Sequence, residues 1–152
     1  MLSPEVGLLL QILDEAYEKA AWHGPNLRNS LRGVPVAEAC WRPAPDQPNL
    51  WEIAIHCAYW KYVVWRRLTG AKRGGFPRRG SDWFARPAED VKWPEEIALL
   101  DEMHGKLRAA VAEMPPEQLD LVRLVSGAAA HDVYHAGQIQ MLRRLFKRAA
   151  AS

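Results

Sequence analysis

The chain has 152 residues, of which 49% are hydrophobic and 25% are charged, and its formal net charge is +2. This balance is typical of a soluble globular protein and excludes a disordered chain or a collagen. A membrane protein is also excluded, because no apolar run approaches the ~18 residues that a spanning helix needs. The length predicts one domain over residues 1–152. Only two cysteines, and no signal-peptide pattern at the start, predict a cytoplasmic protein.

The composition favours helices. Ala and Leu, the strongest helix formers, together number 39, whereas the β-branched residues Val, Ile and Thr number 16. Proline inside a helix costs about 3 kcal/mol, so helices are expected between the eleven prolines. Four proline-free windows are long enough for a helix: 5–24, 49–76, 95–114 and 117–152.

Local signals mark where these helices begin and end. Ser3 is a suitable cap for the first helix, and Pro4 suits its first position. In the second window Asn49 is followed three residues later by Glu52, which predicts a capping box, and Gly70 predicts the end of that helix. Each window also repeats its apolar residues at spacings of three and four, so each helix has one apolar face.

Four amphipathic helices in one small domain predict an all-α fold, a four-helix bundle. The connections over residues 25–48 and 71–93 are long and rich in Pro and Gly, and they also carry several aromatic residues. Such crossovers allow consecutive helices to run parallel, and the second and third helices are expected to form a parallel pair.

Three histidines lie on the apolar faces of two of these helices. His131 and His135 are four residues apart on the fourth helix, so their side chains lie on one face with Cβ atoms about 5–6 Å apart. His56 lies on the apolar stripe of the second helix. A single buried histidine is usually a hydrogen-bonded core residue, but three unpaired imidazoles would each cost about 1–3 kcal/mol to bury. The cluster therefore predicts a metal site.

A site with three histidines leaves one coordination position open, as catalytic zinc sites do. Imidazole ligands suit zinc or nickel, and also iron or copper. Because the ligands are neutral, the divalent metal would strongly acidify a bound water or thiol.

The motifs resemble the DinB/YfiT-like superfamily. The resemblance rests on His56 within residues 50–60 and on the sequence HDVYHAGQI at residues 131–139, with further likeness at WHGP (22–25) and WRP (41–43). It implies a four-helix bundle with long crossovers, a homodimer, and His56, His131 and His135 as metal ligands. It also implies a metal-dependent transferase or isomerase that uses a low-molecular-weight thiol, such as bacillithiol or mycothiol, on a small-molecule substrate.

Other side chains are expected to support the site or to line a pocket beside it. Gln138 is three residues past His135, Asp132 follows His131, and Glu52 precedes His56 by one helical turn. Trp60, Tyr134 and His23 are candidates for the pocket wall. Each also has a structural alternative: packing amide, solvated residue, helix cap, core aromatic or helix end.

Two other functions stay open. Residues 66–79 contain six Lys or Arg, Gly74, Gly75, Phe76 and no acid, a pattern that suits an anion-binding or nucleic-acid-binding loop. Short charge runs are more often solvated loops, and the rest of the chain is acidic, so a nucleic-acid partner is not expected. The other possibility is a dimerising scaffold without catalysis. A membrane partner is not expected.

Overall fold

The computed structural model describes residues 2–152, apart from the side chains of residues 116, 119 and 120. All its regular elements within that range are helical, which confirms the all-α prediction. Four helices are long, namely α1 (Pro4–Tyr17), α4 (Leu50–Thr69), α5 (Trp93–Ala112) and α6 (Val122–Ala150). The short ones are α2 (Leu27–Ser30), α3 (Val36–Cys40) and the 3₁₀ helix η1 (Pro116–Leu121). No helix in the described range combines the length and the apolarity needed to span a membrane.

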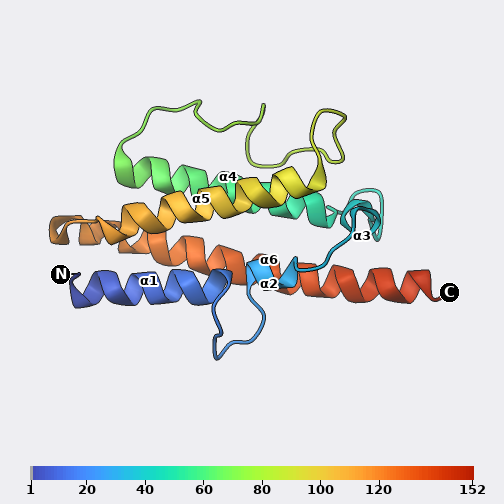
Figure 1. Ribbon diagram of the computed structural model, residues 1–152, viewed down its shortest axis with the longest axis horizontal. Helices are drawn as coiled ribbons and strands as arrows, with labels where there is room; N and C mark the ends of the chain where they lie inside the picture. Colours follow the sequence, from blue (N-terminus) through green and yellow to red (C-terminus); the bar gives the residue numbers. More distant parts are fainter. Residues whose placement is uncertain (1) are drawn as a thin grey trace.

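The four long helices lie side by side in two parallel pairs (Figure 1). Helices α4 and α5 run in the same direction, and α1 and α6 both run in the opposite one. The connection over residues 70–92 returns along the length of α4 before α5 begins, as the predicted crossover requires. This topology brings the middle of α4 next to the middle of α6, which is where the histidines lie.

The helix ends follow the predicted local signals. The Ser3 hydroxyl accepts a hydrogen bond from the Val6 amide, and Asn49 and Glu52 form the expected reciprocal capping box of α4. Gly70 ends α4 in the left-handed conformation, with φ of 71°. A side chain rarely adopts that conformation, so glycine is the favoured residue at this position.

The first helix is shorter than its proline-free window. It ends at Tyr17, because Glu18 leaves helical geometry and the amides of Glu18 and Lys19 both donate to the Asp14 carbonyl. The Asp14 carboxylate in turn binds Arg108 of α5 at 2.7 and 3.0 Å, which fastens this end of α1 to the bundle. Ala20, which lies inside the window 5–24, is therefore exposed in a loop.

The connection over residues 25–48 contains two short helices that the sequence analysis did not predict. Asn26 caps α2 by accepting from the Asn29 amide at 3.2 Å, and Leu27 and Leu31 are fully or almost fully buried beneath it. Tertiary burial stabilises this short helix, because four residues are too few to be helical alone.

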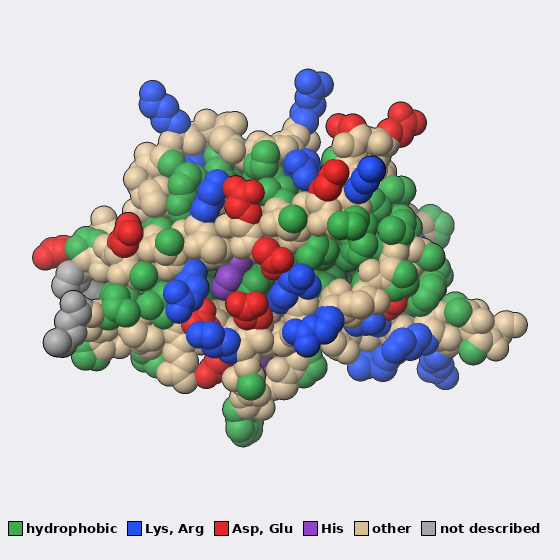
Figure 2. All heavy atoms as spheres, viewed as in Figure 1, with side chains coloured by type: hydrophobic (Ala, Val, Ile, Leu, Met, Phe, Trp, Pro, Cys, Tyr) green, Lys and Arg blue, Asp and Glu red, His purple; other side chains and the backbone are tan. Residues whose placement is uncertain are grey.

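The visible face of the molecule carries Lys and Arg interspersed with Asp and Glu (Figure 2), whereas the bundle interior contains two apolar clusters that meet at a polar layer. On α5 one cluster ends at Met103 and the other begins at Leu107. On α6 the change falls between Ala129 and Ile139. The histidines of both helices lie in these intervals, so the apolar packing on either side holds the polar side chains in the middle of the bundle.

Candidate metal centre

The three histidines from α4 and α6 converge on one point. The Nε2 atom of His131 lies 3.1 Å from Nε2 of His56 and 3.1 Å from Nε2 of His135. His56 and His135 are almost fully buried, and His131 is half-buried. Residues 75 positions apart in the chain therefore present the same ring atom to a common centre.

Hydrogen bonds at Nδ1, the ring nitrogen that points away from the common centre, fix the tautomers of His56 and His135. Nδ1 of His56 lies 2.8 Å from the Asp82 carbonyl oxygen, and Nδ1 of His135 lies 2.7 Å from Oε1 of Gln138. Both partners are acceptors, so Nδ1 carries the proton and donates in each ring. The Nε2 atoms of His56 and His135 therefore carry lone pairs that point at His131.

This arrangement cannot be satisfied by hydrogen bonds among the three rings. Nε2 of His131 carries at most one proton, so it can donate to only one of its two neighbours. At least one of the short nitrogen–nitrogen contacts then leaves the lone pair of His56 or His135 without a donor, which is unfavourable in a buried site. A cation at the common point removes this conflict, because all three lone pairs become ligands.

The spacing also fits a metal ion. Tetrahedral ligands with bonds of about 2.0–2.1 Å are about 3.3 Å apart, close to the 3.1 Å separations here. One ligand atom from each of His56, His131 and His135 lies within 4.8 Å of the others. His56 and His135 also each have a hydrogen-bonded Nδ1, as metal-binding histidines usually do. The residues present therefore fit a divalent cation.

The protonation states agree with this conclusion. Burial lowers the pKa of His131 to about 3, with further lowering by the neighbouring His135 and His56. Burial also lowers the pKa of His135 to about 4 and reduces that of His56. The imidazoles are thus neutral at neutral pH, which is the form that binds metals.

The connection over residues 70–92 encloses the site from one side. Trp83 stacks on the His56 ring, with ring centres 3.9 Å apart and an angle of 11° between the planes. The Trp60 indole donates to the Asp82 carboxylate at 2.8 Å, which fixes the backbone segment that accepts from His56. Asp82 and Trp83 were not predicted, because they lie in an irregular segment. The one sequence signal was the gathering of aromatic residues there.

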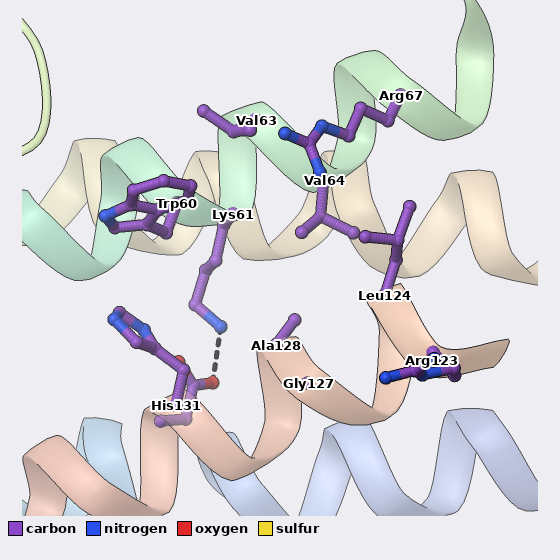
Figure 3. Close-up of a pocket in the computed structure, with 11 residues that line it drawn as sticks. Trp60, Lys61, Val63, Val64, Arg67, Arg123, Leu124, Gly127, Ala128 and His131 are labelled. Atoms are coloured by element: carbon purple, nitrogen blue, oxygen red, sulfur yellow. Dashed lines mark hydrogen bonds and ion pairs between the residues drawn. The ribbon is translucent and has the colours of Figure 1, made fainter. Parts of the chain in front are cut away.

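A groove between α4 and α6 opens beside the candidate metal centre (Figure 3). Its volume is about 190 Å³, and His131 lines one end of it. Lys61 of α4 and Asp132 of α6 also line the groove, and their side chains form a buried ion pair. His131 is therefore the ligand through which a molecule in the groove would approach the metal.

Lys61 belongs to a second polar cluster that the sequence analysis did not find. Its ammonium group lies 3.4 Å from Nδ1 of His104 and 4.8 Å from the centre of the Tyr17 ring, which stacks on His104. Only 1% of Lys61 is exposed. The sequence signal for this cluster is the position of Lys61 within the apolar pattern of the second helix. Asp132 thus serves this cluster, since its one hydrogen-bond partner among the described side chains is Lys61.

Of the other expected residues, Gln138 and Tyr134 lie beside the site. Gln138 accepts from His135 and donates to the Tyr134 hydroxyl at 3.2 Å. The Tyr134 ring contacts His135 edge-on, with centres 5.0 Å apart, although Tyr134 is mostly exposed. Trp60 lines the groove and contacts the His56 ring at its edge.

Glu52 does not orient His56, and its alternative role as a helix cap is confirmed, whereas the pocket position expected for His23 is wrong. The Glu52 side chain turns back to the start of α4, where it binds Arg42 at 2.5 and 2.7 Å and the amides of Asn49 and Arg86. It caps the helix and does not orient His56. His23 is exposed in the loop after α1, because that helix ends at Tyr17 before it can carry His23 toward the site.

Cys57, the residue after His56, also lies near the site. Its sulfur can come within 4.8 Å of ligand atoms of His131 and Asp132, because α6 packs over the face that Cys57 presents. Burial raises the pKa of the Cys57 thiol well above its usual value. The thiol form is a weak ligand and a weak nucleophile, so Cys57 stays outside the three-histidine set.

The basic stretch over residues 66–79 forms a second recess, of about 460 Å³, next to the groove. Arg66, Arg67, Arg73 and Arg78 line it together with aromatic side chains. Arg78 is tied to the buried carboxylate of Glu96 at 2.7 Å, so at least one of the six cations has a structural partner.

The residues matched by a known family include all three histidines. The sequence model of the DinB superfamily matches residues 20–140, most of the chain. The chain belongs to this superfamily. No curated protein and no solved structure matches it.

Proposed function

We propose that this protein is a metal-dependent enzyme that acts on a small molecule. His56, His131 and His135 would hold a divalent cation, with zinc and nickel as the first candidates. When bound, a cation with three neutral ligands and an open position lowers the pKa of a further ligand and stabilises negative charge on it. A low-molecular-weight thiol or water would be that ligand, giving transferase, isomerase or hydrolytic chemistry.

One observation carries the proposal. The three Nε2 atoms converge on one point, and the lone pairs of His56 and His135 are fixed toward it. The Asp82 carbonyl and the Gln138 amide oxygen hold the rings of His56 and His135 in the binding orientation before any metal arrives. Metal sites require such preorganisation from the surrounding residues. A purely structural cluster would need at least one more hydrogen-bond donor to pair all three ring nitrogens.

The surrounding side chains would shape the reaction. Trp83 covers the His56 side of the centre and limits the access of water there. The groove beside His131 offers an apolar surface, so a substrate would replace water on that side. The Lys61–Asp132 ion pair keeps that part of the lining close to electrically neutral. The resemblance of the motifs to thiol-using DinB/YfiT-like enzymes supports a thiol as co-substrate.

Metal analysis of protein purified without an immobilised-metal column tests the proposal. About one metal ion per chain is expected in the wild type after dialysis, and almost none in His131→Ala. His23→Ala is the matched control, since this histidine is exposed and lies outside the cluster. Far-ultraviolet circular dichroism checks that each variant is folded. Equal trace amounts of metal in wild type and His131→Ala would refute the metal site.

A second assay tests the thiol chemistry. Metal-loaded protein is mixed with bacillithiol, mycothiol or glutathione and with simple electrophiles, and thiol consumption is followed. Turnover that requires both metal and His131 supports a transferase. Absence of turnover with every thiol, in protein that does hold the metal, would leave hydrolysis as the chemistry to test.

A further inference from the structure

The groove between α4 and α6 has different chemistry at its two ends (Figure 3). His131 lies at one end, and Arg67 of α4 and Arg123 of α6 lie toward the other. The walls between them are apolar or small, formed by Trp60, Val63, Val64, Leu124, Gly127 and Ala128. A molecule that fills the groove would therefore contact the candidate metal at one end, apolar side chains in the middle and two guanidinium groups at the other end.

The two arginines that line the groove are both exposed. Among the described side chains, neither Arg67 nor Arg123 has a hydrogen-bond or ion-pair partner, whereas Lys61 in the same groove is neutralised by Asp132. The lining thus carries three cations and one carboxylate. Arginine binds carboxylates through two parallel hydrogen bonds, and these are stronger beside an apolar wall than in open water.

The length of the groove limits the size of the ligand. His131 and Arg123 are eight residues apart on α6, which corresponds to about 12 Å along the helix axis. An arginine side chain can cover part of that distance. The volume of about 190 Å³ is also below the roughly 300–1,000 Å³ of sites for drug-sized ligands. A short chain fits these dimensions and a large aromatic cofactor does not.

We propose that this groove selects a small substrate or thiol with a reacting group at one end, a short apolar middle and an anionic group at the other. The reacting group lies beside His131, and the anion binds Arg67 and Arg123. This inference rests on the proposed function, since it assigns the reacting end to the metal. The recess lined by Arg66 and Arg73 continues beyond Arg67, so it adds positive charge at the anionic end.

Two thiols of equal length provide the test. Protein loaded with Co²⁺ is titrated with mercaptohexanoate and with the neutral mercaptohexanol, and the sulfur-to-cobalt charge-transfer band reports binding. The wild type is expected to bind the carboxylate thiol about tenfold more tightly, the size of a charge-assisted hydrogen bond. Added salt should reduce this preference, because the arginines lie at the solvent end of the groove.

Arg67→Gln and Arg123→Gln should each reduce the preference, and the double variant should abolish it without changing the affinity for mercaptohexanol. Arg148→Gln is the matched control, because this arginine is also on α6 but does not line the groove. Equal affinity of the wild type for both thiols would overturn the inference and leave the metal proposal intact. Failure to bind cobalt would instead refute the proposed function.

If the protein does not bind cobalt, a measurement on metal-free protein still tests the inference. Hexanoate should shift the side-chain Nε–H resonances of Arg67 and Arg123 in a nitrogen–proton correlation spectrum, and hexanamide should not. Arg148 should not respond to either compound. Identical spectra with the two compounds would show that the groove does not recognise the anion.

Discussion

Two buried clusters in the middle of the bundle use histidine in opposite ways. In the first, His56, His131 and His135 direct ring nitrogens at one another with too few protons to pair them. In the second, Nδ1 of His104 faces the ammonium group of Lys61, so the cation is part of the chain. The comparison shows that burial alone does not predict a metal site. The deciding feature is whether the chain itself supplies the positive charge.

The clusters are separate in chemistry but adjacent in space. Asp132 pairs with Lys61, while its neighbour in the chain, His131, faces the other two histidines. Consecutive residues on α6 therefore serve different clusters, since they point about 100° apart around the helix. The following predictions separate the two clusters by experiment.

The largest effect is expected from Lys61→Met. It leaves the Asp132 carboxylate buried without its partner, and breaking a buried ion pair typically costs about 3–5 kcal/mol. Urea unfolding in the presence of EDTA measures the loss. Lys106→Met is the matched control, since its pair with Glu102 is exposed and worth at most about 1 kcal/mol. Equal losses in both variants would mean that the buried pair does not hold the bundle together.

Metal should stabilise the first cluster and not the second. Zinc at a hundred times its dissociation constant should raise the free energy of unfolding of the wild type by about 2.7 kcal/mol. His56→Ala should remove this increase, and His104→Ala should retain it, although it lowers the baseline stability. Unfolding curves with and without zinc measure both effects. An increase that survives in His56→Ala would place the zinc elsewhere.

Gln138→Ala tests the orientation of a single ligand. The variant removes the acceptor for Nδ1 of His135, and loss of such partners typically lowers metal affinity about 10- to 100-fold. Competition with a chromophoric chelator measures the affinity. Gln140→Ala is the control on the same helix, because Gln140 donates to Ser30 and does not contact a histidine of the site. Unchanged affinity in Gln138→Ala would show that packing alone orients His135.

Per unit of pH, the smallest effect is expected in acid stability. Burial lowers the pKa of His104 from 6.5 to about 3, so between these values the unfolded chain binds a proton that the folded chain does not. Stability is therefore lost as the pH falls from about 6.5 toward 3, by up to about 1.4 kcal/mol per pH unit for this group. His104→Gln should make the slope shallower by that amount in metal-free protein. A slope equal to that of the wild type would mean that His104 is accessible to protons when folded.

Much of the candidate site could be predicted from the sequence, because helical periodicity is local. The four-residue spacing of His131 and His135 places both rings on one face of α6, whatever the rest of the chain does. Gln138 follows by the same argument, and the structure brings it to His135. His56 could be assigned to an apolar face in the same way, although its distance to the other two depended on the packing of α4 against α6.

The remaining parts could not be predicted, because they depend on contacts between distant segments. Asp82 and Trp83 reach His56 only because the crossover returns along α4. Lys61 is buried because Asp132 arrives from α6, and a lysine without such a partner is expected at the surface. Glu52 was predicted both as a helix cap and as a neighbour of His56, and only the cap is confirmed, since the side chain turns toward the start of α4. His23 was misplaced because the early end of α1 depends on backbone hydrogen bonds that periodicity does not reveal.

The sequence by itself determined the all-α class, the caps at Ser3, Asn49 and Gly70, and the faces on which the three histidines lie. These properties follow from interactions within one or two helical turns. Only the tertiary structure decided that the three Nε2 atoms meet, that a lysine neutralises the neighbouring carboxylate, and that arginines line the far end of the groove. The reason is physical: each of these features joins helices that are distant in the chain, and packing alone sets their distance and rotation.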